Sequence, residues 1–258
     1  MLRLLSLLSA LAAPTGVEPM LAQETPATTP AVDPTRAALD AVNKDWYRRD
    51  SSGVITKTIA TLEALQAQEP SNFEVKWQLA RFYYWAATEP STDAATKASL
   101  GKKGWDAAEA AKKLNPSAVE GYYWTAANIG AYAQASGIMT AIKQGLGDVL
   151  EQNAKKAVQI SPKHDQAGPL RALGRYYYKL PWPLQDLGNA RIYLEKAYAA
   201  SPTNALNILY LAELEYADDH DDKGKALLDE LFALDPAKGD GPSTRRTQKE
   251  GRAFLAEQ

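Results

Sequence analysis

The sequence predicts an all-α protein built from about five consecutive helix pairs. Proline recurs at the end of successive Ala- and Leu-rich stretches, at Pro70, Pro116, Pro162, Pro202 and Pro236. Because proline has no backbone N–H and disfavours helix at the residue before it, each of these positions predicts a helix end. The intervals between them are 46, 46, 40 and 34 residues. No segment sustains the period-2 alternation of a half-buried strand. The pattern therefore predicts repeated helical units.

Within the units, small and large apolar residues recur at matching places. Two antiparallel helices approach closely only where one presents a small residue, and Ala80, Ala126 and Gly174 stand at that place in the second, third and fourth units. The first unit departs, because Trp46 stands there instead. The shortest interval, 34 residues, equals the tetratricopeptide period. We therefore expect a tetratricopeptide-like helical-repeat solenoid, in which stacked pairs supply the core. A generic helical bundle without stacked repeats is the alternative.

Two segments outside the repeat carry further expectations. Residues 243–258 follow a Gly- and Pro-containing breaker and mix apolar with charged residues, which predicts a C-terminal capping helix. Residues 129–150 are less polar, but four polar residues argue against an integral membrane segment there: Gln134, Lys143, Gln144 and Asp148. This segment either forms an extra amphipathic helix over the stack or contacts a partner or a second copy.

The N-terminus predicts export. Residues 1–22 place the basic Arg3 before an apolar run of about ten residues, as in a signal peptide. Residues 23–36, rich in Pro, Thr and Ala, are expected to be a disordered linker, and residues 37–258 the repeat domain. The alternative is an apolar tail on a cytoplasmic protein. The expected location is periplasmic or otherwise exported and soluble, because no cysteine is present to carry a lipid.

Composition argues against catalysis, nucleic-acid binding and metal binding. The 31 acidic and 29 basic residues leave no basic excess for a nucleic-acid footprint. The chain has no cysteine and two histidines, and no catalytic or phosphate-binding motif. The acidic run at residues 218–222 imitates a calcium loop, but Lys223 stands where an oxygen ligand belongs. We therefore expect a binding protein, not an enzyme, with no cofactor and no metal.

The candidate binding surface is the concave face of the stack. First-helix positions that face this side in a tetratricopeptide stack are occupied by aromatic and arginine residues, namely Trp77, Arg81, Tyr84, Trp85, Tyr123, Arg171, Arg175 and Tyr178. Arg171 and Arg175 are four residues apart and so share one helix face. Arginine beside aromatic rings suits a carboxylate, a peptide or an acidic partner loop. Alternatively, the tyrosines are packed repeat residues and the arginines solubilise the face.

Several segments resemble one transport family. The run from Gly121 to Gly130, the run from Gly174 to Pro181, the helix before Pro202 and the closing helix with Arg245, Arg246 and Arg252 are similar to the T component of tripartite ATP-independent periplasmic (TRAP) transporters. The resemblance implies a soluble periplasmic trimer with a pore-like channel that docks a substrate-binding protein. Members of that family are often lipoproteins, and this chain has no cysteine for a lipid.

A second stretch, Leu173 to Leu211, resembles the helical-repeat family of microtubule-dynamics regulators. Two functional hypotheses follow from these features. The first is an accessory of periplasmic solute transport that docks a binding protein and passes an anionic small solute. The second is a general exported adaptor that binds a peptide or protein during envelope assembly.

Overall fold

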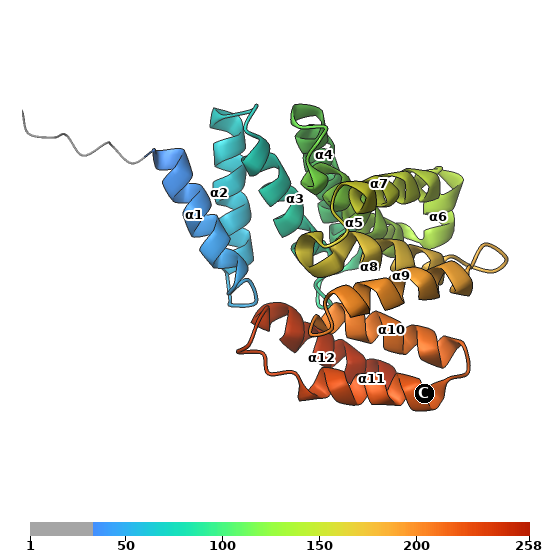
Figure 1. Cartoon of the computed structure of the whole chain (residues 1–258). Helices are drawn as coiled ribbons and strands as arrows, with labels where there is room; N and C mark the ends of the chain where they lie inside the picture. The colour runs from blue at the N-terminus through green and yellow to red at the C-terminus, as the bar shows by residue number, and fades with distance from the viewer. Residues whose placement is uncertain (1–32) are drawn as a thin grey trace, which may run out of the picture. The chain divides into compact units, whose positions relative to one another are not determined.

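The computed structural model describes residues 33–258, and residues 34–258 form one compact unit. Residues 33–258 contain helices and no β-strand, which confirms the all-α prediction. The helices form five antiparallel pairs in chain order (Figure 1): α1 (Pro34–Trp46) with α2 (Val54–Gln68), α3 (Phe73–Ala87) with α4 (Ala94–Leu114), α5 (Val119–Ser136) with α7 (Leu146–Ile160), α8 (His164–Lys179) with α9 (Leu187–Ala200), and α10 (Ala205–Ala217) with α11 (Asp221–Ala233).

The predicted signal peptide, residues 1–22, lies outside the described residues, as do residues 23–32 of the predicted linker. Helix α1 begins at Pro34, three residues before the start predicted for the repeat domain. Proline suits the first turn of a helix, because its fixed φ is helical and the missing N–H would have no partner there. Residues 34–36 therefore belong to the first helix and not to a linker.

Four of the five marker prolines follow directly on a helix end. The residues that cap α2, α4, α7 and α9 at their C-termini are Glu69, Asn115, Ser161 and Ser201, each one residue before a proline. The next helix then often begins with a side-chain cap, as where Asn72 and Asn204 accept hydrogen bonds from backbone N–H groups of the first turn. The proline spacing thus predicted the helix boundaries because both signals act on the backbone locally.

Close helix contacts occur at the predicted small residues. A Cβ on Gly174 would lie 2.5 Å from Leu194 Cγ, so only glycine allows α8 to approach α9 there. Ala80 and Ala126 are fully buried in the same way. Trp46, the exception in the first unit, packs against α3 and α5, where its ring meets Phe82, Trp85 and Trp124 edge-on at centroid distances of 5.4–6.5 Å.

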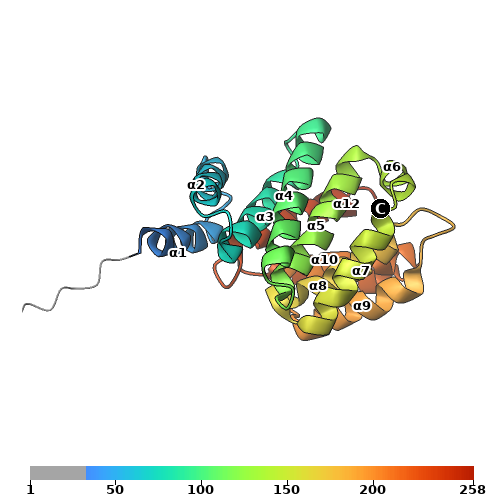
Figure 2. The same cartoon turned by 90° about the horizontal axis from the view of Figure 1, so that it is seen from above.

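The segment 129–150 is not one extra helix. It comprises the end of α5, the short helix α6 (Ile138–Lys143) and the start of α7. Ile129, Ala141, Leu146 and Leu150 are buried in one apolar cluster with residues of α8, α9 and α10. The segment therefore belongs to the third helix pair, and Figure 2 shows α6 beside the ends of α5 and α7 that it connects.

The predicted capping helix is present as α12 (Gly241–Leu255), which packs on α10 and α11. Gln248 donates hydrogen bonds to the backbone carbonyls of Leu231 and Leu234 at 3.0 and 2.9 Å, and Phe254 meets Tyr216 edge-on. Between residues 33 and 258, no helix combines the length and apolar character needed to cross a membrane.

Candidate functional site

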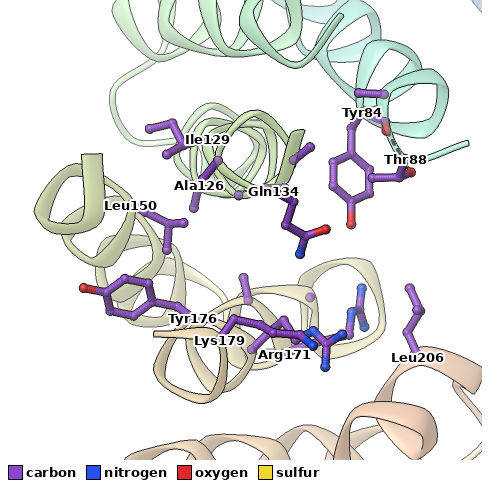
Figure 3. A pocket seen from close by; sticks show the side chains of 18 of the residues that line it. Tyr84, Thr88, Ala126, Ile129, Gln134, Leu150, Arg171, Tyr176, Lys179 and Leu206 are labelled. Carbon is purple, nitrogen blue, oxygen red and sulfur yellow. Dashed lines mark hydrogen bonds between the residues drawn. The ribbon is translucent and has the colours of Figure 1, made fainter. Parts of the chain in front are cut away.

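The inner faces of the helices line a partly open cavity of about 660 Å³. Its walls come from the first helices of successive pairs, α3, α5, α8 and α10, together with α6, α7 and α12. Figure 3 shows Tyr84 and Gln134 extending into this space from one side and Arg171 from the other. The superhelical arrangement of first helices positions all of these side chains, because in a stack of helix pairs the first helices share the concave side.

One half of the cavity is apolar. Its wall is formed by small and aliphatic residues of α5, α6, α7 and α8, among them Ala126, Ile129, Ile138, Ile142, Leu146 and Leu150. Several of them are alanines and glycines, which leave room without exposing polar atoms. This half suits an apolar group, since burying it there removes apolar surface from water on both sides.

The other half is polar and centres on Arg171. The Arg171 guanidinium is buried and donates to Asn207 Oδ1 at 2.9 Å, to the Gln166 carbonyl at 3.2 Å and to the Tyr123 hydroxyl at 3.3 Å. Its Nη2 also lies 3.4 Å from Asp165 Oδ2. These contacts join α5, α8 and α10. Burial opposes the charge, but nearby Tyr123 and Asp165 outweigh it, so the pKa of Arg171 is raised and it stays protonated.

The Arg171 contacts hold an unusual turn at the start of α8. Asp165, Gln166 and Ala167 all adopt left-handed φ angles of 48°, 53° and 66°, a region that non-glycine residues rarely occupy. The Gln166 carbonyl accepts hydrogen bonds from both Arg171 and Asn207. Three strained residues in a row persist only where surrounding contacts over-determine them. This turn brings Asp165 and Gln166 to the cavity wall.

Arg175 is also committed within the fold. It forms a forked ion pair with the buried Glu213, and its guanidinium lies 4.0 Å from the centroid of the Tyr210 ring. Arg171 and Arg175 therefore do point to the concave side, as their spacing predicted. Each guanidinium group already has an acidic neighbour, so the charge of neither arginine is unpaired.

The cavity wall also carries the hydroxyls of Tyr84 and Tyr210 and the carboxylate of Glu250, which are not engaged in the ion pairs and hydrogen bonds that hold Arg171 and Arg175. Burial, reinforced by the nearby Glu250 charge, raises the pKa of Tyr84 and of Tyr210. Burial also raises the pKa of Glu250, against the opposing effect of Arg246 and Arg175. These groups face the cavity and are available to a ligand.

Charged side chains are concentrated on the cavity wall on the α12 side. Arg49 lies 3.8 Å from the Trp46 ring centroid and 4.0 Å from that of Trp85, and Arg246 lies 3.3 Å from that of Trp85. Arg49 pairs with Asp240 at 2.7 Å. Altogether six cationic side chains line the cavity against four acidic ones.

Comparison with known proteins identifies a family and a similar solved structure. A family model described as regulator of microtubule dynamics protein 1-3 matches residues 45–181, more than half of the sequence. The chain belongs to this family. A solved structure, a thermophilic TPR protein of Thermus thermophilus, is similar with a TM-score of 0.63 and 17% identity, over 84% of this chain and 98% of that chain. This likeness shows the tetratricopeptide-like fold. No curated protein matches the chain.

The family match covers α2 to α8 and supplies much of the cavity wall, whereas α9 to α12 lie beyond it. It agrees with the second resemblance read from the sequence, although over a different stretch. The comparisons do not bear out the resemblance to the TRAP T component, which remains an expectation from sequence.

Five of the eight predicted binding residues line the cavity of this family member: Tyr84, Trp85, Tyr123, Arg171 and Arg175. Trp77, Arg81 and Tyr178 are not among the lining residues. The Arg81 guanidinium lies between Trp46 and Trp77, at 4.0 and 5.1 Å from their ring centroids, and burial lowers its pKa to about 10. The Tyr178 hydroxyl donates to the Glu213 carbonyl at 3.4 Å.

Sequence reasoning missed Tyr210 and the whole α12 contribution, including Glu250. No local signal marks these residues, because their approach to the cavity depends on how far the superhelix turns over five pairs.

At the acidic run of residues 218–222, Asp218 pairs with Arg191 at 2.8 Å. Between residues 33 and 258, no cluster of three or more His, Asp or Glu side chains could hold a metal ion.

Proposed function

We propose that this family member is a non-catalytic scaffold that holds one ligand in its concave cavity. The observation that carries the proposal is the cavity itself, about 660 Å³ with one apolar and one polar half. Ligand sites are typically mostly apolar clefts of this size, with a few placed polar groups that fix orientation. The cavity wall offers no nucleophile–base pair, and its acids and arginines are largely committed to each other.

The ligand class that fits is a small molecule or chain end with an apolar body and an anionic end. The apolar body would lie against α5, α6 and α7. The anionic end would meet the uncommitted hydroxyls of Tyr84 and Tyr210, in a field set by six cations against four acids. Hydrogen bonds to a charged acceptor in such a desolvated site are worth about 1.5–3 kcal/mol each.

Two settings are compatible with this site. In the first, the chain is a soluble exported accessory of solute transport that docks a periplasmic substrate-binding protein and passes an anionic solute, as a trimer. In the second, it is an exported adaptor that takes the end of a partner protein into the cavity. The description of its family names microtubule dynamics, and sedimentation with microtubules tests whether that description extends to this chain.

Calorimetry with the full chain tests the site directly. Straight-chain carboxylates from butyrate to dodecanoate should bind more tightly as the chain lengthens, and the matching alcohols should bind less well. Tyr84→Phe should weaken carboxylate binding about tenfold, which corresponds to the loss of one hydrogen bond to a charged group.

Ala133→Trp, on the cavity wall, should abolish carboxylate binding by filling the space. Ala226→Trp, on the exposed side of α11, is the matched control and should change nothing. Binding of apolar-ended peptides in place of carboxylates would favour the adaptor, and absence of both would refute the proposal.

A further inference from the structure

On one side of the cavity, ion pairs join parts of the chain that are distant in sequence. Helix α12 packs its apolar residues on α10 and α11, in a cluster that also holds Leu228, Leu231 and Phe254. The N-terminal pairs have a separate apolar cluster around Trp46, Phe82 and Trp124. These two clusters share no residue.

Across the boundary, the connection includes three ion pairs, a shared aromatic ring and hydrogen bonds from Arg246 to the Trp85 carbonyl and the Thr88 hydroxyl. Asp240 accepts from Arg49 at 2.7 Å, Asp50 accepts from Arg245 at 2.7 Å, and Glu89 accepts from Arg246 at 2.5 Å. The Trp85 ring lies under the guanidinium groups of both Arg49 and Arg246. We call these seven residues the clasp: Arg49, Asp50, Trp85, Glu89, Asp240, Arg245 and Arg246.

The clasp is weaker than the packing on either side of it. Ion pairs that are partly exposed, such as Asp50 with Arg245, gain little in water and are screened by salt. Arg49 is almost fully buried, its Nε has no partner among the described residues, and burial lowers its pKa. A buried charge that is incompletely paired opposes closure. Each flank is held together by its own apolar cluster, and the two clusters share no residue.

Opening at the clasp needs no break elsewhere. In a solenoid each helix pair contacts mainly its neighbours, so a small change at every interface adds up to a large displacement between the ends. Because Arg49, Trp85, Asp240 and Arg246 also line the cavity, separation of α12 from α1 and α3 would open its wall to solvent.

We propose that the clasp is an electrostatic closure of the cavity, and that α12 parts from α1 and α3 as a unit with α10 and α11 when the clasp is screened or broken. The closure stands apart from the proposed function. Only its effect on ligand exchange rests on that function.

Paired spin labels measure the closure without any ligand. The chain contains no cysteine, so Lys44→Cys on α1 and Lys249→Cys on α12 introduce the only two labelling sites. Both lysine side chains are exposed, and neither belongs to the clasp. Ala226→Cys on α11 with Lys249→Cys is the control pair within the C-terminal layer.

The α1–α12 distance should lengthen and its distribution broaden in 1 M sodium chloride, where the screening length falls to about 3 Å. It should lengthen equally in low salt after Arg246→Ala, and after Glu89→Gln, which removes the same pair from the other side. The α11–α12 distance should not change, and helical circular dichroism should be retained.

An unchanged α1–α12 distance under all three conditions would overturn the proposal. So would equal broadening of both label pairs, because that would mean general loosening. The distances remain decisive even if no carboxylate binds, so failure of the closure and failure of the ligand site are distinguishable. If the ligand site is correct, Arg246→Ala should also speed dodecanoate release at least about tenfold.

Discussion

The hydroxyl of Tyr123 donates a hydrogen bond of 2.7 Å to the carboxylate of Asp165, which joins the middle of the chain to the left-handed turn that begins α8. Left-handed backbone costs a non-glycine residue roughly 1–2 kcal/mol. Tyr123 of α5 binds Asp165, and Asn207 of α10 donates to the Gln166 carbonyl, so the turn survives because α5 and α10 hold it from two sides. Residues chosen from sequence as ligand contacts thus also build the wall that a ligand would touch.

We predict that Arg171→Ala destabilises the fold by about 3–5 kcal/mol, since removal of one partner leaves buried polar groups uncompensated. Asp165, Asn207 and the Gln166 carbonyl would each lose a donor. Urea denaturation of the full chain measures the effect. Arg36→Ala, which removes an exposed arginine with two ion pairs, should cost much less, because exposed ion pairs contribute little to stability. Equal losses in the two variants would contradict the structural role of Arg171.

Two glycines of α5 should respond oppositely to alanine. A Cβ on Gly121 would lie 2.7 Å from the backbone of Lys112, so Gly121→Ala forces α4 and α5 apart and should cost about 1–3 kcal/mol. The Gly130 Cβ position has its nearest neighbour at 3.7 Å, which is ordinary contact. Gly130→Ala should therefore stabilise by roughly 0.5–1 kcal/mol through helix propensity. Thermal unfolding of both variants measures these changes in stability. A lower melting temperature in both would show that α5 tolerates no added methyl group at either position.

Glu250 should make stability depend on pH. Burial raises its pKa in the folded state above the ordinary 4.5, so folding disfavours the charged form. The destabilisation is absent below about pH 4.5 and develops as pH rises through the folded pKa. Glu250→Gln should raise the melting temperature at pH 7, and the gain should disappear towards pH 4. Glu257→Gln, at the exposed end of the chain, should show no such trend, and a gain independent of pH would contradict the assignment.

Calcium should not bind the turn before α11. Asp218 is paired with Arg191, and Glu215 with both Arg191 and His220, which leaves too few free oxygen ligands for a site of six to eight. Calorimetry should show no micromolar calcium binding. Binding that disappears in Asp219→Ala would prove the prediction wrong.

The sequence by itself determined the helices, their pairing and the side of the stack that Arg171 and Arg175 face. These features follow from local chemistry: proline ends a helix, and Gly174 or Ala126 marks where two helices touch. This periodicity can be recognised along the sequence, because each helix pair contacts mainly the pairs next to it in the chain.

Only the tertiary structure decided which of those residues meet. The contact between Arg246 and Trp85, which stand 161 residues apart, depends on the accumulated rotation of five helix pairs. The left-handed turn at Asp165 likewise needs partners on α5 and α10, since its own residues disfavour it. Sequence patterns report which face a side chain takes on its own helix, whereas the partner on a distant helix is set by the curvature of the whole stack.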